Sequence, residues 1–252
     1  MADKKIADRI VALLDTTPDD VIFEIGSGRG TLTKLIAESG ARVFSFELDR
    51  RLIDDLNKKF DNCENVRIVN GDFLRVEPGD YYSGKFKLIG NIPYDITSPL
   101  IDWIIRFRER IVRAVITTQK ELGDRISSHP GSRDWAPIAV FCQCFFEIKT
   151  VMTIPPSAFY PPPRVISSAL IFEPRTSPEI SDRETFELIV RRAFKQRRKL
   201  LVNNLDGFEG LDRKSVELIL DSLGIDPKSR AEQLGIGDFI ALSEAITSAK
   251  LS

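Results

Sequence analysis

The stretch Phe23-Glu24-Ile25-Gly26-Ser27-Gly28-Arg29-Gly30-Thr31 decides the fold of this chain. It starts as the end of an apolar strand over 21–25, passes a cluster of glycines, and continues with helical spacing over 31–39. Glycines let the backbone approach a ligand at the carboxyl end of a strand. The dinucleotide fingerprint requires a further glycine where Thr31 stands. By itself, the stretch fits either a ligand-binding turn or a tight structural turn.

Strand-like and helical segments alternate along the chain after this stretch. The predicted strands cover 42–46, 66–69, 87–90 and 114–118, and the predicted helices cover 50–60 and 98–107. Two further strand-like runs, 145–154 and 165–172, are joined by a proline-rich loop and predict a hairpin at the sheet edge. The fold class is therefore α/β, with a seven-stranded, mostly parallel, Rossmann-like sheet and helices on both faces.

The pattern changes after residue 175. Only helical periodicity remains from Glu184 onward, and glycines and a proline interrupt it. We therefore expect two domains, a catalytic domain over 1–175 and a small all-helical domain over 176–252.

Composition restricts the class of protein. The chain has 252 residues, 42% hydrophobic residues and a net charge of −1, so a nucleic-acid site requires local clustering of Lys and Arg. No apolar stretch approaches the roughly 20 residues that span a bilayer, and no secretory signal is found at the start. We expect a cytoplasmic protein without membrane contact. Cys63, Cys142, Cys144 and the single His129 do not have metal-site spacing, so we expect reduced thiols and no metal.

Two carboxylates follow later strands of the predicted sheet. Glu47 ends the second strand, where a carboxylate can accept both hydroxyls of a ribose. Asp72 and Phe73 follow the third strand, where an aspartate can accept from an adenine amino group and an aromatic side chain can pack on the ring. Each carboxylate alone is more often solvated or a helix N-cap. Together with the glycine turn, they favour an adenosine cofactor.

The tetrad Asn91-Ile92-Pro93-Tyr94 follows the fourth strand. It combines an amide oxygen, a proline-restricted backbone and an aromatic ring, which suit the exocyclic amine of a flat base. It contains no strong general base, so the chemistry that it predicts depends on alignment. The alternative is a tight turn that closes the strand, with Tyr94 in the core.

A cluster of cations lies near residue 195. Six cations fall within nine residues on a predicted helix: Arg191, Arg192, Lys195, Arg197, Arg198 and Lys199. Such a run is often a solvated helix face. Beside a base-modifying site, it predicts contact with the phosphate backbone of RNA.

With these residues in order, the chain resembles the S-adenosylmethionine-dependent rRNA adenine N6-dimethyltransferases, from about Met1 to about Leu205. The segment 24–28 resembles the first cofactor motif of that family, and Asn91 to Tyr94 matches its catalytic tetrad. The loop 155–165 and the basic segment 193–199 resemble the KsgA-type branch, which acts on the small ribosomal subunit.

The resemblance implies the cofactor, the partner and the roles of the site residues. It implies that S-adenosylmethionine binds to Met1, Glu24, Gly26, Gly28, Glu47, Leu48, Asp72, Phe73 and Asn91. It implies catalysis by Asn91, Ile92, Pro93 and Tyr94, with Phe159 on the other face of the adenine. The implied activity is N6,N6-dimethylation of two adjacent adenines in small-subunit rRNA, on a precursor of the 30S subunit, by a monomer.

Three alternatives stay open at this point. One is a noncatalytic RNA- or DNA-binding factor that keeps the fold, and another is a large-subunit rRNA methyltransferase of the macrolide-resistance type. A DNA adenine methyltransferase is the third, although those enzymes usually carry a proline where Ile92 stands. Family members also usually begin with a Gly-Gln-x-Phe-Leu segment that folds over the cofactor, and Met1 stands at its last position. We therefore expect either a longer natural chain or a cofactor site that lacks part of this segment.

Overall fold

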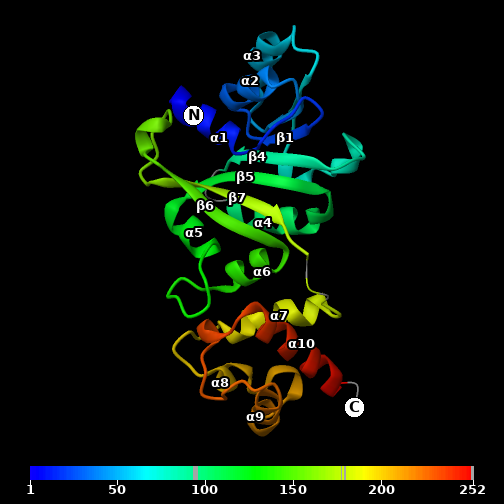
Figure 1. Cartoon of the computed structure of the whole chain (residues 1–252), viewed down its shortest axis with the longest axis vertical. Coiled ribbons are helices and arrows are strands. Elements are labelled where there is room, and N and C mark those ends of the chain that lie inside the picture. The colour runs from blue at the N-terminus through cyan, green and yellow to red at the C-terminus, as the bar shows by residue number, and fades with distance from the viewer. Residues whose placement is uncertain (93–95, 177, 179, 251–252) are drawn as a thin grey trace. The chain divides into compact units, whose positions relative to one another are not determined.

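The computed structural model describes residues 1–92, 96–176, 178 and 180–250, with side chains up to residue 248. Its contacts divide the chain into two units (Figure 1). The first comprises Met1–Gly123 and Phe146–Arg175, and the second comprises Asp124–Phe145 and Thr176–Ser252.

A single sheet organises the first unit. Its strands are β1 (Val21–Ile25), β2 (Arg42–Glu47), β3 (Val66–Asn70), β4 (Phe86–Asn91), β5 (Ile111–Gln119), β6 (Phe146–Ile154) and β7 (Ser167–Pro174). The order is β3-β2-β1-β4-β5-β7-β6. The first five strands in this order are parallel, whereas β7 runs antiparallel to both β5 and β6. The predicted seven-stranded, mostly parallel sheet with an edge hairpin is confirmed.

Helices α2 (Thr31–Glu38), α3 (Arg50–Phe60) and α4 (Thr97–Arg106) connect the parallel strands. Helix α1 (Lys4–Ala12) precedes β1, and α5 (Lys120–Ile126) follows β5. The chain moves outward from β1 through α2 and α3, then returns to the other side of β1 and continues through α4. Right-handed crossovers in opposite directions place these helices on opposite faces of the sheet. Helix α1 is not among the predicted helices, although Asp3 caps it by accepting from Ile6 N at 3.1 Å.

The two faces of the sheet have different cores because successive strand residues point to opposite sides. Ile22 and Val43 lie in an aliphatic cluster with residues of α1 and α2. Phe23, one residue later, lies on the aromatic face, with its ring centroid 4.3 Å from Phe86 and 5.3 Å from Phe44. Because both faces are covered, every residue of β1 is buried, and all of them except Glu24 are apolar.

The second unit is helical. It contains α6 (Pro137–Phe145), α7 (Arg183–Ala193), α8 (Leu201–Leu205), α9 (Arg213–Ser222) and α10 (Ile236–Lys250). The fully buried Trp135 donates from its indole N–H to the Leu234 carbonyl at 3.0 Å. The predicted helical character of the C-terminal region is confirmed. Residues 124–145 have their contacts in this unit, although they precede the boundary after residue 175 that the sequence suggests.

No helix in the described part of the chain combines the length and the apolarity that a bilayer crossing requires.

Candidate functional site

Four parallel strands end at one edge of the sheet. Ile25 at the end of β1 is in register with Phe46 of β2 and Gly90 of β4, and Glu47 is in register with Asn70. The carboxyl ends of β1 to β4 are therefore level. The strand order reverses direction between β1 and β4, and ligands of open α/β sheets bind outside the strands at such a point.

The turn after β1 requires its glycines. Gly26, Gly28 and Gly30 have positive φ angles of 74°, 55° and 70°, which residues with a Cβ rarely adopt. A Cβ on Gly30 would lie 2.7 Å from a ring carbon of Phe60, so α3 also packs against the turn. Cβ atoms on Gly26 or Gly28 would meet no atom within 4 Å. The side of the backbone on which a Cβ would lie at these two positions is therefore open to a ligand.

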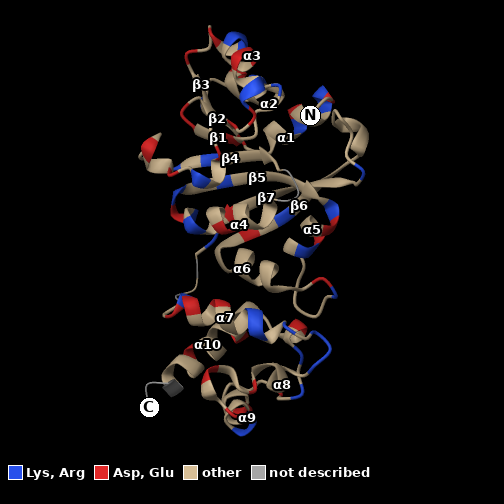
Figure 2. Ribbon diagram, turned by 180° about the vertical axis from the view of Figure 1, so that it is seen from behind, with Lys and Arg blue, Asp and Glu red and all other residues tan. Residues whose placement is uncertain are grey.

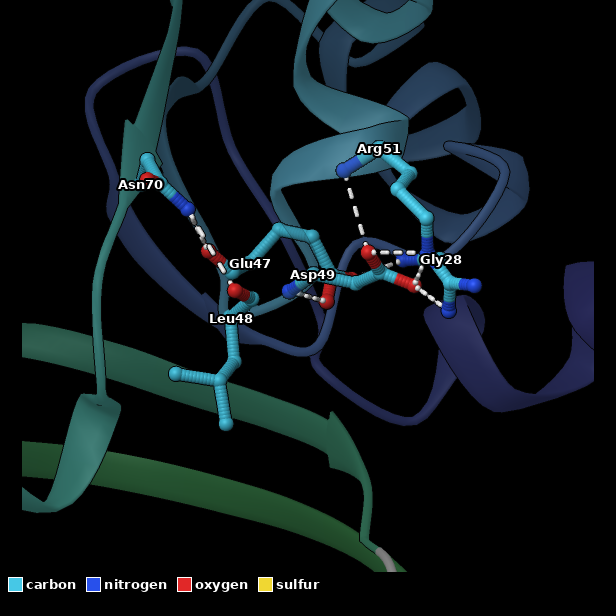
Figure 3. Close-up of polar contacts among 6 residues, drawn as sticks. All are labelled: Gly28, Glu47, Leu48, Asp49, Arg51 and Asn70. Atoms are coloured by element: carbon cyan, nitrogen blue, oxygen red, sulfur yellow. Dashed lines mark hydrogen bonds and ion pairs between the residues drawn. The ribbon is translucent and has the colours of Figure 1, made fainter.

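Glu47 is held in place by the turn beside it (Figure 3). Its carboxylate accepts from Gly28 N at 2.8 Å and from Asp49 N at 2.9 Å. The side-chain amide of Asn70 donates to the Glu47 carbonyl at 2.9 Å and so fixes the backbone at the strand end. A carboxylate has about four acceptor positions, so Glu47 retains capacity for two hydroxyl donors. The structure thus gives the expected ribose acceptor a fixed orientation.

The apolar surface at this edge comes from Leu48. Its side chain is 69% exposed and points away from the polar contacts of Glu47 (Figure 3). The ring of Phe73, in contrast, lies in the core, 5.2 Å from the ring of Phe46 and 4.5 Å from that of Trp103. The expectation that Phe73 packs its ring on an adenine does not match this position, because the ring is enclosed by aromatic neighbours. Leu48 offers the exposed apolar surface instead.

Asp72 caps the short 3-10 helix that follows β3. One of its carboxylate oxygens accepts from Leu74 N at 3.0 Å, and the other lies 3.6 Å from Arg75 Nε. Each carboxylate oxygen has two lone pairs. Asp72 can therefore cap the helix and still accept a hydrogen bond from an adenine amino group.

Glu24 is a buried carboxylate at the centre of a hydroxyl network. One of its oxygens accepts from Ser45 Oγ at 2.5 Å and from Thr33 Oγ1 at 2.6 Å. Ser45 Oγ lies 2.6 Å from Ser27 Oγ, which connects the network to the glycine turn. The other carboxylate oxygen has no partner among the described residues. Burial raises the pKa of Glu24 to about 7, against the opposing effect of the hydroxyl bonds.

This raised pKa predicts a pH-dependent stability. Between its ordinary pKa of 4.5 and its folded pKa of about 7, Glu24 binds a proton in the folded chain but not in the unfolded chain. The free energy of unfolding should therefore fall as pH rises through this window, by on the order of 2–3 kcal/mol. In the neutral variant Glu24→Gln, this fall in the free energy of unfolding should be absent. Urea unfolding of both proteins between pH 5 and pH 8 measures the difference, and parallel profiles would contradict the prediction.

A cavity of about 220 Å³ opens beside the end of β4. Its walls include Asn91, Ile92, Phe159 and Tyr160, together with Met1. The buried Ile92 donates from its N–H to the Thr117 carbonyl at 3.0 Å, so β5 fixes the backbone directly after Asn91. Phe159 is 9% exposed and forms part of the aliphatic core cluster. Asn91, Ile92 and Phe159 therefore meet at one cavity, whereas Pro93 and Tyr94 lie outside the described residues.

The first residues of the chain connect this cavity to the glycine turn. Ala2 N and Asp3 N donate to the Ala158 carbonyl at 2.7 Å and 3.2 Å. Thr31 Oγ1, at the start of α2, donates to the Met1 carbonyl at 3.2 Å. Residues 1–3 therefore link the loop that carries Phe159 to the first turn of α2 by hydrogen bonds.

The cation cluster lies partly outside a helix. Helix α7 ends at Ala193 and residues 194–198 form turns, so the prediction that the whole cation cluster lies on a helix is wrong. The segment between α7 and α8 is mostly blue in Figure 2. A hollow of about 480 Å³ is lined by Gln196 to Lys199.

Three of the six cations are engaged by the protein. Arg191 lies over the ring of Phe141 at 5.1 Å, and Arg192 donates to the Asp206 carbonyl at 3.1 Å. Arg197 donates to the Trp135 carbonyl at 3.2 Å and lies 3.6 Å from a Glu232 oxygen. The side chains of Lys195, Arg198 and Lys199 are exposed and bond to no described residue. These three are the cations that remain available to a ligand.

The hydroxyl network of Ser27, Thr33 and Ser45 is not among the features predicted from the sequence. A signal for it existed, because Ser45 stands between two phenylalanines in a buried strand. The cysteines are free thiols, as expected. Among the described residues, no group of three His, Cys, Asp or Glu side chains could hold a metal ion.

The ribosomal RNA adenine dimethylase family model matches residues 1–248. Ribosomal RNA small subunit methyltransferase A of Geobacter metallireducens is 36% identical, over 98% of this chain and 92% of its own length. The protein of the same name from Bacillus cytotoxicus is 34% identical, over 100% of this chain and 90% of its own.

Two solved structures have the same fold over nearly the whole chain. The 23S rRNA methyltransferase ErmE has a TM-score of 0.76 and 27% identity, over 98% of this chain and 99% of its own. A dimethyladenosine transferase from Plasmodium falciparum has a TM-score of 0.87 and 23% identity, over 99% of this chain and 98% of its own.

Proposed function

This chain belongs to the ribosomal RNA adenine dimethylase family, and from that membership we propose that it dimethylates N6 of adenines in small-subunit rRNA. One observation carries the proposal. The glycine turn and Glu47, which suit an adenosine cofactor, lie at the same sheet edge as the cavity with Asn91 and Phe159.

The relatives favour this substrate over the alternatives. The curated relatives named as small-subunit enzymes are more similar in sequence than the 23S rRNA methyltransferase is. A noncatalytic factor would not need the carboxylates and the amide at the strand ends, and Glu47, Asp72 and Asn91 are all present.

The residues at the sheet edge fit S-adenosylmethionine, the cofactor of this family. When bound, it supplies a methyl group on a sulfonium sulfur. Glu47 would accept from the ribose hydroxyls, and Leu48 would pack against the adenine ring while Asp72 accepts from its amino group. Gly26 and Gly28 leave room for the methionine part of the cofactor. Met1 lines the neighbouring cavity.

Asn91 and Ile92 would orient the amine of the target adenine. The Asn91 side-chain oxygen and the Ile92 carbonyl would accept the two N6 protons and so direct the nitrogen lone pair along the transfer axis. Positioning of this kind can contribute roughly 7–11 kcal/mol to lowering a barrier. The Ile92 N–H bond to Thr117 keeps the carbonyl in place. No general base is required before the transfer, and the proton leaves to solvent afterwards.

The adenine must leave its base stack to enter the cavity. Phe159, on the cavity wall, would cover one face of the ring, and Tyr94 is proposed for the other; each stack contributes about 1–3 kcal/mol. The free-energy cost of unstacking a base is lowest in single-stranded loops, so such loops are the favoured targets.

Residues 176–252 are proposed as an RNA contact because of Lys195, Arg198 and Lys199. Replacing all three by glutamine should weaken RNA binding and reduce the slope of log K against log salt by about 2–3, at roughly 0.9 per lost phosphate contact. Filter binding between low and high salt measures this slope. The control replaces the exposed Lys58, Lys85 and Lys214 by glutamine, and an equal reduction there would contradict the assignment.

Transfer of label tests the function. The protein is incubated with labelled S-adenosylmethionine and undermethylated 30S subunits, naked rRNA or DNA. Label in N6,N6-dimethyladenine of the 30S subunits is expected. Transfer to naked large-subunit rRNA or to DNA would favour an alternative enzyme, and RNA binding without transfer to any substrate would favour a noncatalytic factor.

The proposal includes a cytoplasmic location and a monomeric state. Multi-angle light scattering of the purified chain measures the second, and a dimer mass would contradict it.

A further inference from the structure

A contact between Arg29 and Tyr160 joins the glycine turn to the loop after β6. The guanidinium carbon of Arg29 lies 5.3 Å from the centroid of the Tyr160 ring. Arg29 stands between Gly28 and Gly30, and Tyr160 directly follows Phe159. Neither side chain has a role in the proposed transfer.

Tyr160 is an exposed aromatic ring on the wall of the target cavity. Its side chain is 72% exposed, the largest exposure among the exposed large hydrophobic side chains described, and it lines the same cavity as Asn91 and Phe159. The Arg29 contact orients the ring and leaves most of its surface to solvent. An oriented, exposed ring at the mouth of a base-binding cavity is a stacking surface for a second base.

Arg29 offers a cation beside that surface. Its guanidinium forms no hydrogen bond or ion pair with a described residue. Its backbone is fixed, because Lys59 Nζ donates to the Arg29 carbonyl at 2.7 Å. The planar fork of a guanidinium suits a phosphate and can stack on a ring at the same time. Arg29 is therefore placed to bind a phosphate next to a base that stacks on Tyr160.

We propose that Arg29 and Tyr160 form a subsite for the nucleotide next to the target adenine. The inference rests on the proposed function. Cα atoms of consecutive residues are about 3.8 Å apart, so Phe159 and Tyr160 would contact bases that are close along the RNA. Tyr160 binds the neighbouring base, and Arg29 binds its phosphate. The pair thereby contributes to the choice of target and to substrate affinity, rather than to the transfer itself.

A cycle of enzyme and substrate changes tests the stacking role. Undermethylated small subunits are reassembled with rRNA in which each nucleotide flanking the target adenine is made abasic in turn. With the wild-type enzyme, loss of one of the two flanking bases should raise KM about 5- to 100-fold with little change in kcat. Tyr160→Ala should raise KM by a similar factor on intact subunits. For this variant, removing the same flanking base should cause no further rise in KM.

Two variants act as controls for this cycle. Tyr160→Phe keeps the ring and should stay within about twofold of the wild type. Val165→Ala trims another exposed side chain of the same loop and should leave the abasic effect intact. If the abasic effect keeps its size in Tyr160→Ala, or if neither flanking base matters to the wild type, the inference is overturned.

Salt dependence tests Arg29. Arg29→Gln should reduce the slope of log(kcat/KM) against log salt by about 0.7, the value for one phosphate of a single strand, without changing the Kd of S-adenosylmethionine. An unchanged slope would overturn the phosphate role. Failure of the proposed function is a separate result, because the wild-type enzyme would then methylate no small subunits at all.

Discussion

Asn91→Ala should lower kcat for methyl transfer by about 10²-fold or more while the Kd of S-adenosylmethionine changes by only a few fold. The side chain stands at the end of β4, in register with Thr117 of β5, and lines the target cavity. Removing its oxygen leaves one N6 proton without an acceptor and lets the amine rotate away from the transfer axis. Misplacement of a reacting group by about 1 Å can cost 10²-fold in rate. Single-turnover methylation of undermethylated 30S subunits, with calorimetry for the cofactor, measures both quantities.

Asn57→Ala is the matched control for Asn91. Asn57 lies on an exposed position of α3, so the same chemical change should leave both kcat and cofactor binding unaltered. An equal loss of transfer and cofactor binding in Asn91→Ala would contradict the role in orienting adenine. The residue would then act mainly as part of the cofactor site.

Glu47→Gln should raise the Kd of S-adenosylmethionine by roughly 10- to 100-fold, since hydrogen bonds to a charged group contribute about 1.5–3 kcal/mol. The glutamine keeps the size of the side chain but turns one acceptor into a donor. That donor would face either Gly28 N–H or Asp49 N–H, both of which the carboxylate accepts in the wild type. The variant therefore loses an acceptor for the ribose and loosens the glycine turn.

Calorimetry and a saturation series separate the two effects of Glu47→Gln. At saturating cofactor, kcat should recover to within a few fold of the wild type, because Glu47 contacts no reacting atom. Glu64→Gln, at an exposed position between α3 and β3, serves as the control and should bind cofactor normally. Unchanged cofactor affinity in Glu47→Gln would refute the assignment of this carboxylate to the ribose.

The strands of the parallel sheet were predictable because each is a short apolar run between helical segments. β1 and α3 begin and end at the predicted residues, and the remaining parallel strands extend the predictions by a few residues. Residues at strand ends were equally accessible to prediction. Parallel strands bring their carboxyl ends to one edge, so the sequence alone places Glu47, Asp72 and Asn91 together.

The direction of a side chain and the end of a helix were harder to predict where distant residues pack against them. Phe73 follows a strand end, as expected, but the aromatic core formed with Phe46 and Trp103 holds its ring. The cations at 195–199 continue a helical charge pattern, but α7 ends at Ala193, where Phe194 packs 5.7 Å from Phe239. The position of the Phe73 ring and the end of α7 both depend on packing partners that are distant in sequence. No local sequence pattern specifies those partners.

The sequence by itself determined the sheet, the glycine turn and the residues at the strand ends, because local periodicity and backbone requirements specify each of them. Only the tertiary structure decided how these parts are arranged around the candidate site. It buried Glu24 among the hydroxyls of Thr33 and Ser45, and it brought Arg29 against Tyr160. Both arrangements depend on contacts between segments far apart along the chain, which form only when the helices and the β6–β7 loop pack onto the sheet.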